Sequence, residues 1–595
     1  MVCVVVGLLS SVANLSYSET VEQEIQNIEQ QIKKTNAQLL DAQRNQQNNL
    51  IELNQAKLAL KQQETEKHIH SNKLLKDLGV DEMFPQQNQA KSSLFALDYN
   101  RYPTNIYPNY FKFSSPDNQF ELEFHGWVQV DNDIFPNYLG LFVDDGPSIV
   151  GIVNQSTVDR LMIRRLRPTL EGQLADYFQY FLNLDFGQGS ITLYDAFVDV
   201  NYYRAIGFQA GLQMSLVSGI ENFFDNFDYV SRAFTMEMGY PAMMAPDRQV
   251  GAMFHGSFGP SGNEPYWRGL SQLGFDDWFS YQVGFFNGVP DGSQVTNYTT
   301  IGSTYPYPFL RSSQTVFTAA NKAFAGRVFF NPFIAAKGSL LEHLGFGFAG
   351  SAERPNYQYG LPDLVSLGQN PIFTYTSLPF GSSFYTVAAN GPRTRLHPQA
   401  VWGYGPIGVL ADWTQTQQHL QLIALGSLNS VTTYYPATTG QTNQAGQVQF
   451  IYNLTQEDFN LFHFIPNNKF KPFEKGAYGG FQLVFRLSKL LLDPSVFKDY
   501  VKMGAYNYYL YSDPRISVQQ ANSWSIGLNW YWNEFIRLTT EYDYSSFVGG
   551  CSTGGLNAPV NPGCLTGGQY IFANTSTVLN RPAEKIIMQR LQLTF

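Results

Sequence analysis

The 595-residue sequence is poor in charge and contains no long apolar run. Only 14% of its residues are charged, whereas soluble domains usually contain about a quarter, which argues against a set of ordinary soluble domains. After residue 10, no apolar run approaches the roughly 18 to 20 residues that a membrane-spanning helix requires. These two absences exclude a helical membrane protein and leave a fold that distributes its apolar residues in an alternating pattern.

The sequence also lacks the usual signs of catalysis. Its eight histidines accompany no recognisable nucleophile motif, and neither a His-x-x-x-His spacing nor a Gly-x-x-x-x-Gly-Lys phosphate loop is present. Hydrolysis or acyl transfer would need a nucleophile with a histidine and an orienting group. A hydrolase is therefore the weaker alternative, and we expect no enzymatic activity, metal ion, cofactor or nucleic-acid partner.

Aromatic residues are abundant, at 15% of the chain, and they recur in alternating stretches through most of it. In the stretch 177–186, Phe178 and Leu182 share one face, whereas Gln179 and Asn183 share the other. Stretches of about ten residues that alternate in this way between turns are typical of transmembrane β-barrels. The sequence therefore predicts an all-β transmembrane barrel of about 16 to 18 antiparallel strands.

The positions of the tryptophans favour a membrane barrel over a soluble β-sandwich, which would show the same alternation. Trp524, Trp530 and Trp532 lie on the apolar face near strand ends, where membrane proteins carry belts of aromatic side chains. We therefore expect the apolar face of the barrel to contact membrane lipid.

The final strand has the clearest alternation. Leu591, Leu593 and Phe595 face one way, whereas Arg590 and Thr594 face the other. A terminal phenylalanine on such a strand resembles the signal by which the barrel-assembly machinery recognises outer-membrane barrels. We expect Leu591, Leu593 and Phe595 to form this insertion signal, which places the protein in the outer membrane of a Gram-negative cell.

The first 118 residues differ from the barrel. Residues 1–18 contain a short apolar core followed by small and polar residues, which predicts a signal peptide, although the basic residues that usually precede such a core are missing. Either the natural start lies upstream, or the signal is atypical, or this stretch is a buried strand. Residues 79–118 are predicted to be a linker, and residues 119–595 to be the barrel.

Residues 19–78 contain no Gly, Pro or aromatic residue, and their heptad pattern predicts a periplasmic α-helical coiled coil. The apolar seam residues are Val21, Ile25, Ile28, Ile32, Leu39 and Leu53. The alternatives are a single solvated helix or a disordered tether. A helix of this length would reach about 90 Å, far enough to contact peptidoglycan, and its self-association would match a homotrimer.

Three long inserts rich in Gly, Ser, Thr and Pro are expected to be external loops, namely 290–321, 353–395 and 414–475. We expect at least one of the inserts to fold into the barrel and narrow the lumen. Cys551 and Cys564 lie in a further long insert just before the closing strand, and an oxidising cell envelope favours a disulfide between them. The alternative is two free surface thiols.

The barrel sequence resembles the phosphate-selective porins O and P of Gram-negative outer membranes. The matching stretches follow the order of that family and are 164–172, 193–197, 247–256, 281–288, 325–332, 527–530 and the closing strand. The resemblance implies a trimeric, 16-stranded channel whose constriction carries basic residues that attract anions. It does not extend to residues 1–118.

Several charged residues are candidates to line this lumen. In the stretch 161–174, Arg165 and Arg167 alternate with leucines, so they are expected to point inward. The resemblance places Asp195 at the family's aspartate near the constriction. We expect the pore-lining residues that set selectivity to be Arg164, Arg165, Arg167, Asp195, Arg327 and Arg590. The alternative is that such charges brace the barrel in ion pairs without affecting selectivity.

The sequence does not decide between these two roles. Residues 211–218 lack the lysine and the proline that the family carries at this point. Segment 19–78 holds eight basic and nine acidic residues, so about nine of the ten net negative charges lie elsewhere, and no global positive field attracts anions. A few charges in a narrow mouth can nevertheless determine selectivity.

The sequence therefore predicts a passive, water-filled outer-membrane channel for small hydrophilic solutes or ions, with a preference for anions or phosphate left open. The alternative is an adhesin or envelope-tethering barrel without a transport role.

Overall fold

The computed structural model consists of two compact units, Met1–Gln89 and Ala90–Phe595. In the first unit it describes only Gln30, Lys33 and Lys34, which are helical. The predicted signal peptide and almost all of the predicted coiled coil therefore lie outside the described residues. In the second unit the structure describes residues 112–595 except for 116–118, 137–158, 176, 188–190, 219–234, 260–276, 292–321, 381–382, 426–430, 462–463, 504–505 and 553–577.

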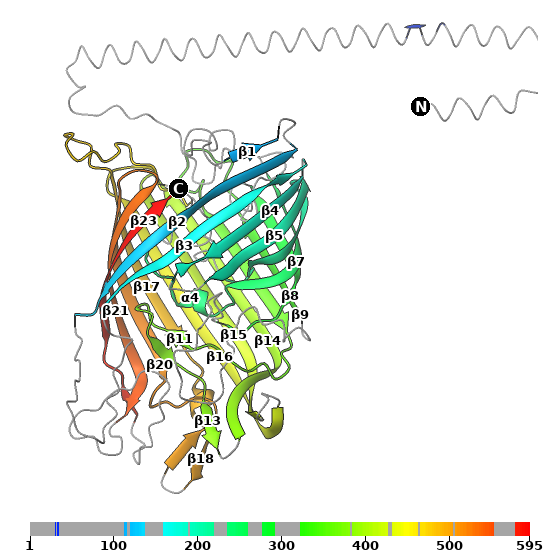
Figure 1. The fold of residues 1–595 in the computed structure, drawn as a ribbon, viewed down its shortest axis with the longest axis vertical. Helices are drawn as coiled ribbons and strands as arrows, with labels where there is room; N and C mark the ends of the chain where they lie inside the picture. The colour runs from blue at the N-terminus through cyan, green and yellow to red at the C-terminus, as the bar shows by residue number, and fades with distance from the viewer. Residues whose placement is uncertain are drawn as a thin grey trace, which may run out of the picture. The chain divides into compact units, whose positions relative to one another are not determined.

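Nineteen strands form one antiparallel sheet, and sixteen of them close into a barrel (Figure 1). The other three, β1 (Lys112–Ser114), β13 (Ser377–Phe380) and β22 (Val578–Asn580), each pair with one barrel strand only. The structure thus confirms the predicted barrel of about 16 to 18 strands. The sixteen barrel strands are β2 (Phe120–Ile134), β3 (Arg160–Leu174), β4 (Phe178–Asp185), β5 (Thr192–Tyr203), β6 (Ile206–Met214), β7 (Arg248–Phe258), β8 (Phe279–Asn287), β9 (Lys322–Phe330), β10 (Gly345–Glu353), β14 (Ser383–Tyr404), β15 (Ile407–Leu425), β16 (Val431–Asn453), β17 (Gly480–Leu491), β20 (Val518–Tyr531), β21 (Ile536–Ser552) and β23 (Glu584–Thr594).

The first and last barrel strands close the ring. In this pairing of β2 with β23, Val128 lies opposite Leu593. At the end of the pairing, Gly126 and Phe595 exchange two backbone hydrogen bonds of 2.9 Å, and the Phe595 ring packs 6.0 Å from that of Phe124. No barrel strand described here is therefore left with an unpaired edge that could recruit another chain.

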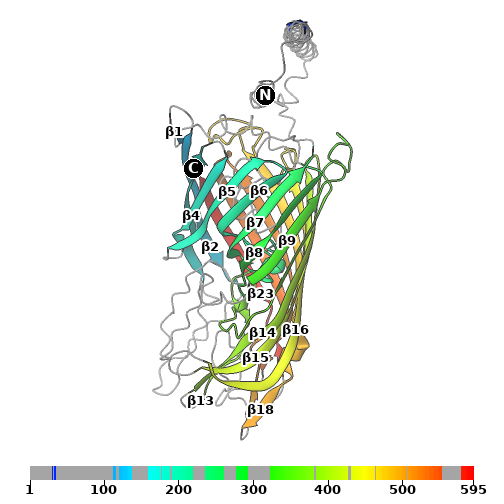
Figure 2. The ribbon, with the colours of Figure 1, turned by 90° about the vertical axis from the view of Figure 1, so that its right-hand side faces the viewer.

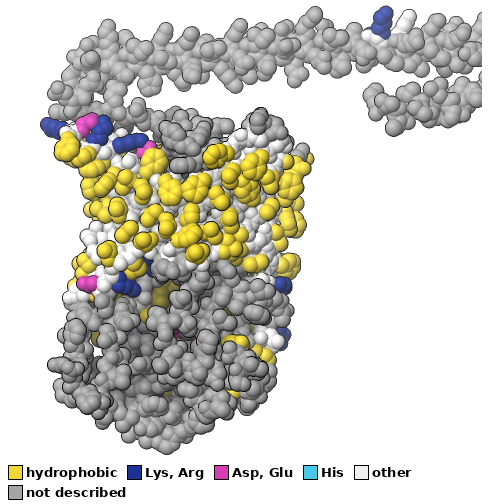
Figure 3. Space-filling model, viewed as in Figure 1, with side chains coloured by type: hydrophobic (Ala, Val, Ile, Leu, Met, Phe, Trp, Pro, Cys, Tyr) yellow, Lys and Arg dark blue, Asp and Glu magenta, His cyan; other side chains and the backbone are white. Residues whose placement is uncertain are grey.

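The two faces of the wall differ in polarity as the alternation predicted. On β3, Leu161 and Ile163 are exposed on the outside, whereas Arg165 and Arg167 are buried on the inside. Figure 3 shows the resulting band of hydrophobic side chains across the face of the barrel in that view. An apolar exterior with a polar interior is the arrangement of a transmembrane barrel. Among the described residues, no helix has the length and apolarity needed to cross a membrane.

Three strands are much longer than expected. β14, β15 and β16 contain 22, 19 and 23 residues and continue beyond their neighbours at one rim (Figure 2). The expectation that 414–475 is an external loop was therefore wrong. Its Gln and Thr residues continue the strand pairing, as where Gln417 lies opposite Thr442, because pairing with neighbouring strands rather than composition decides whether such a segment forms a strand.

The remaining elements belong to the connections at the same rim. These are β11 (Leu364–Val365) paired with β12 (Pro371–Phe373), β18 (Tyr500–Met503) paired with β19 (Tyr506–Tyr509), the 3-10 helix η7 (Pro494–Phe497) and the short helix α4 (Tyr240–Met243). The opposite rim contains Phe595 and is called here the C-terminal rim.

Candidate pore constriction

One connection crosses the interior of the barrel. Residues 235–247, called here the polar crossing, lead into β7 and include α4. The Tyr240 hydroxyl lies 2.7 Å from the Ser523 hydroxyl on β20, and the Tyr240 backbone N–H donates to Ser488 on β17 at 3.3 Å. Because β17 and β20 lie halfway around the ring from β6 and β7, the polar crossing spans the full width of the lumen.

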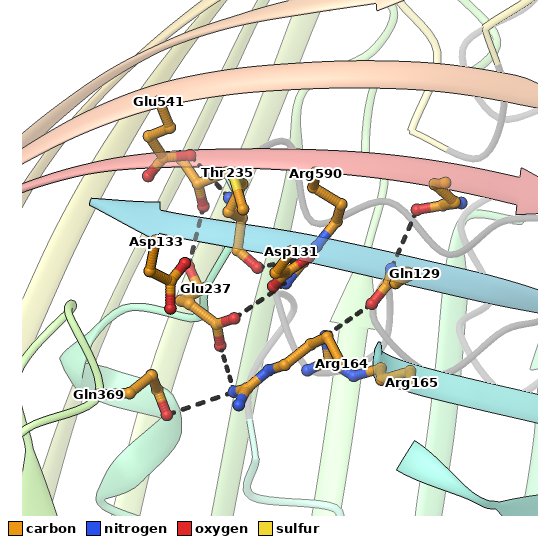
Figure 4. A network of polar contacts seen from close by, with 12 residues as sticks. Gln129, Asp131, Asp133, Arg164, Arg165, Thr235, Glu237, Gln369, Glu541 and Arg590 are labelled. Carbon is orange, nitrogen blue, oxygen red and sulfur yellow. Dashed lines mark hydrogen bonds and ion pairs between the residues drawn. The ribbon is translucent and has the colours of Figure 1, made fainter. Parts of the chain in front are cut away.

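An ion-pair network anchors the polar crossing through Glu237 (Figure 4). Arg164 Nη2 on β3 lies 2.8 Å from one oxygen of Glu237, and Arg590 Nη2 on β23 lies 2.9 Å from the other. Arg590 also donates to both oxygens of Asp131 at 2.7 Å. Glu237 therefore joins the crossing to two neighbouring parts of the wall with charge-assisted hydrogen bonds, which are stronger than neutral ones.

The backbone of the polar crossing is held as well. Arg486 Nη1 donates to the carbonyl oxygen of Glu237 at 2.5 Å, and the Met236 N–H donates to Glu541 at 2.7 Å. Arg590 Nη1 donates to the Met236 carbonyl at 2.6 Å. Since side chains and backbone are fixed together, the crossing has a defined position in the lumen.

The same surroundings determine the charge of Glu237. Burial alone raises the pKa of a carboxyl group, but Arg164, Arg590 and Arg165 outweigh that effect and lower the pKa of Glu237 from 4.5 to about 2. Glu237 is therefore ionised throughout the physiological pH range, and its carboxylate offsets part of the positive charge of the surrounding arginines.

A second segment, residues 354–376, also crosses the lumen and is called here the apolar crossing. It leaves the wall at β10, and its far end reaches β23, where Gly368 N–H and Asn370 Nδ2 donate to the two oxygens of Glu584 at 3.2 and 2.5 Å. Its buried apolar side chains pack against the polar crossing inside the barrel. The residues of this shared cluster include Leu361, Leu364, Leu367, Ile372 and Phe373 of the apolar crossing and Tyr240, Met243 and Met244 of the polar crossing.

The structure therefore bears on the expectation that an insert folds inward. We expected at least one of the three inserts to fold inward, and residues 354–376 of the insert 353–395 form the apolar crossing, whereas most of its remaining residues belong to β13 and β14. The polar crossing lies outside all three inserts named from the sequence. Arg164 contacts both crossings, because its Nη2 also donates to Gln369 at 3.3 Å.

A second cluster of arginines lies on the wall beside the crossings. Arg167 and Arg248 stack on the ring of Tyr194, with guanidinium carbons 3.8 and 4.3 Å from the ring centroid. Arg248 donates to Asp195 at 2.6 Å, and the Tyr194 hydroxyl donates to Asp247 at 2.7 Å. Planar guanidinium groups stack on aromatic rings in this way while keeping their hydrogen bonds.

The structure places all six sequence-predicted pore residues on the inner side of the wall. Arg164, Arg165 and Arg590 surround Glu237, whereas Arg167 and Asp195 belong to the Tyr194 cluster. Arg327, on β9, lies apart from both groups and donates to Gln399 at 3.4 Å. Their effect on selectivity stays a prediction.

Local irregularities in the strands explain two of these positions. Strict alternation would point Arg164 outward, but the pairing of β2 with β3 shifts register between Gln129 and Val130, which leaves Arg164 as an extra residue. A similar shift between β4 and β5 turns both Tyr194 and Asp195 inward. Bulges of this kind reorient side chains at functional sites.

Five of the inward carboxylates near the two arginine clusters are matched to arginines. Each lies within a short distance of a guanidinium nitrogen: Asp131 at 2.7 Å, Asp185 at 2.7 Å, Asp195 at 2.6 Å, Asp247 at 2.9 Å and Glu237 at 2.8 Å. This matching favours the bracing role over an uncompensated ladder of positive charge.

The sequence did not identify several residues of the two clusters. Arg248 and Asp247 begin a strand that was recognised, so their alternation could have placed them inside. Glu237 could not have been found, because nothing in residues 235–247 indicates a segment that crosses a barrel. Cys551 is disulfide-bonded, but Cys564 lies outside the described residues, so their pairing stays a prediction.

No family model matches the chain, and no curated protein matches it. Among solved structures, the outer membrane channel DcaP of Acinetobacter baumannii is similar at 10% identity and a TM-score of 0.40, with 81% of this chain and 99% of that chain covered. Outer-membrane expressed OmpT of Vibrio cholerae has 8% identity, a TM-score of 0.42 and coverage of 81% and 100%. The anion-selective porin from Comamonas acidovorans has 8% identity, a TM-score of 0.37 and coverage of 80% and 100%. Identity and structural overlap are both too low for these similarities to bear on function, and the barrel is established by its own strand pairing.

Proposed function

We propose that the protein is an outer-membrane porin that allows small hydrophilic solutes to diffuse through a hydrated lumen. The observation that carries this proposal is the presence of buried interior amides without a hydrogen-bond partner in the described part of the chain. These atoms are Nδ2 and Oδ1 of Asn183, Oε1 of Gln209 and Nε2 of Gln399. A buried polar group without a partner costs about 1–3 kcal/mol, so these amides favour a hydrated interior over a dry, packed core.

The charge pattern supports weak discrimination between ions. Because Asp131, Asp185, Asp195, Asp247 and Glu237 are paired with arginines, the described part of the lumen presents compensated charge at the two arginine clusters. The stretches that resemble the phosphate-selective porins support the porin assignment, but the Glu237 and Asp195 contacts argue against strong anion preference. We therefore propose that neutral and weakly charged polar solutes pass most readily.

Planar-bilayer recording of the purified protein under a salt gradient tests this function. We expect stepwise conductance with a reversal potential close to zero, and swelling of protein-containing liposomes in isotonic solutions of neutral sugars. The absence of conductance steps would contradict the channel, whereas a reversal potential near the anion limit would contradict only the charge argument.

We also propose a homotrimer, supported by polar residues on the outer face. Asn132 Nδ2 donates to Gln589 at 3.2 Å, and Gln589 lies opposite Thr540. Amide side chains among lipid-facing residues favour contact with another protein surface. Replacing Gln589 with Leu should reduce the oligomer seen in mild detergent, and an unchanged oligomer would place the subunit contact elsewhere.

A further inference from the structure

The turn between β16 and β17 carries an apolar side chain that the barrel does not cover. The Phe473 side chain is fully exposed, at 101%. It lies in the segment 469–475, called here the lysine turn, which also contains Lys469, Lys471 and Lys475. This turn lies at the C-terminal rim, because β17 begins and β23 ends at the same side of the barrel.

The lysine turn is attached to the outer, lipid-facing side of the wall. Trp530 faces outward on β20, and its indole N–H donates to the carbonyl oxygen of Tyr478 at 2.7 Å. The Phe470 ring packs edge-on against Trp530 at 5.0 Å, and the outward ring of Phe481 stacks on the same indole at 5.8 Å. The turn thus continues the aromatic surface of the barrel exterior.

The charges of the turn leave an excess of lysine. Lys471 pairs with Glu474 at 2.6 Å, and Lys469 pairs with Glu534 at 2.5 Å. Both lysine side chains stay more than half exposed in these pairs, at 62% and 55%, and Lys475 is exposed as well. An exposed phenylalanine surrounded by lysines is suited to a surface that is apolar inside and negatively charged at its boundary.

We propose that the lysine turn binds the phosphate-bearing headgroups of anionic phospholipids in the leaflet at the C-terminal rim, with Phe473 inserted among the adjoining acyl chains. The proposal rests on the membrane placement given above. Trp530 and Phe470 position the turn at the depth where aromatic side chains meet headgroups, and the lysines then lie at the level of the phosphates.

A second turn at the same rim provides a natural control. In the turn 331–344, the indole N–H of Trp402 donates to the Leu340 carbonyl at 2.8 Å. This turn also exposes leucines, with Leu340 at 55%, but its one lysine, Lys337, is balanced by Glu342 at 3.2 Å. The turn 331–344 therefore exposes apolar side chains, as the lysine turn does, but has no lysine beyond the one that pairs with Glu342.

The experiment uses the full chain folded into vesicles of phosphatidylcholine with or without phosphatidylglycerol. A spin label is attached at Phe473→Cys without reductant, so that the disulfide of Cys551 stays closed, and the signal of the unsubstituted protein, which carries the label on its third cysteine, is subtracted. The accessibility of the label at 473 to oxygen and to a water-soluble nickel chelate is then compared. Association of spin-labelled phosphatidylglycerol and phosphatidylcholine with the unlabelled protein is measured separately. The lipid measurement is repeated on the triple variant Lys469→Gln, Lys471→Gln, Lys475→Gln and on the control Lys337→Gln.

We expect the label at 473 to be protected from the nickel chelate and accessible to oxygen. We expect the unchanged protein to prefer phosphatidylglycerol by roughly twofold or more, the triple variant to lose this preference, and Lys337→Gln to keep it. A water-exposed label would overturn the insertion. Dipolar broadening of the label that disappears on dilution with unlabelled protein would show that a second copy of the chain covers the turn. A preference for phosphatidylglycerol in the triple variant equal to that of the unchanged protein would overturn the headgroup site. Loss of conductance with a membrane-inserted label would contradict the proposed function alone.

Discussion

The two segments that cross the lumen are anchored by different chemistry. The polar crossing is tied to the wall by Glu237 and by hydrogen bonds to its backbone, and Met236 beside them joins a small apolar cluster on the wall. The apolar crossing contributes a row of buried leucines and aromatic residues to the cluster that includes α4. The first arrangement fixes charge at a defined point, whereas the leucines and aromatic residues of the second fill volume.

This difference predicts which property of the channel each segment controls. Removal of a buried charge leaves its partners uncompensated, which costs about 3–5 kcal/mol and alters the local field. Removal of a buried leucine leaves a cavity that costs about 2–5 kcal/mol but leaves the field unchanged. Conductance should therefore respond to both segments, but ion preference only to the polar crossing.

The largest effect is expected for Glu237→Gln. The substitution keeps the size of the side chain but removes the charge that holds Arg164 and Arg590, at a cost of about 4 kcal/mol to the anchored position of the crossing. Single-channel records should show larger and noisier conductance steps, and the reversal potential should shift toward anions because two arginines lose a counter-charge.

Glu474→Gln is the matched control, since it removes a carboxylate at the C-terminal rim, outside the lumen. It should leave conductance and reversal potential unchanged. If Glu237→Gln behaves like Glu474→Gln in both measurements, the ion-pair anchor does not position the polar crossing.

The next effect is expected for Leu367→Ala in the apolar crossing. Leu367 is fully buried, and truncation should destabilise the packed cluster by about 3 kcal/mol. Conductance noise should rise and the melting temperature should fall, but the reversal potential should stay at its original value. A shift in reversal potential similar to that of Glu237→Gln would remove the distinction between the two crossings. Leu340→Ala, an exposed leucine at the rim, serves as control.

A smaller effect is expected for Arg165→Ala combined with Arg167→Ala. These arginines belong to the wall, so both crossings should stay in place and conductance should change little. Asp185 would lose the Arg167 guanidinium that lies 2.7 Å away, and the reversal potential should move slightly toward cations. Gln129→Ala removes the hydrogen-bond partner of Arg165 without changing charge and should leave the reversal potential unchanged.

The sequence was sufficient for the wall of the barrel but not for its interior. Alternation over ten residues is a local property, so the outward face of Leu591 and Leu593 and the inward face of Arg165 and Arg167 could be read directly. The strand count followed from the same pattern. The length of β14, β15 and β16 could not be read, because a run of Thr and Gln has the composition of a loop and becomes a strand only through its neighbours.

The interior depends on contacts between distant residues. Glu237 meets Arg590, which is 353 positions away in the sequence, and no local pattern marks such a pair. Arg164 was named as a pore residue, yet its inward direction comes from a bulge that the sequence does not reveal. The six predicted residues are therefore on the correct face, but Glu237 and Asp131, which pair with Arg164 and Arg590, were recognised only from the structure.

The smallest expected effect is the response of the polar crossing to pH, which the apolar crossing should not share. The folded-state pKa of Glu237 is lowered to about 2, from the ordinary value of 4.5. A lowered pKa means that this carboxylate contributes stability that is fully present above pH 4.5 and is lost as the pH falls toward 2. Glu237 should thus hold the polar crossing equally well at pH 7 and pH 5, and the noise caused by loss of this anchor should increase only below about pH 4. Recordings of Glu237→Gln over the same pH range separate the effect of Glu237 from that of the other lumen carboxylates. The variant should lack the increase in conductance noise that protonation of Glu237 causes in acid. The Leu367→Ala variant should keep that increase, since its defect is apolar. An increase in noise that begins between pH 7 and pH 5 in the unchanged protein, and persists in Glu237→Gln, would assign the pH response to a different part of the lumen.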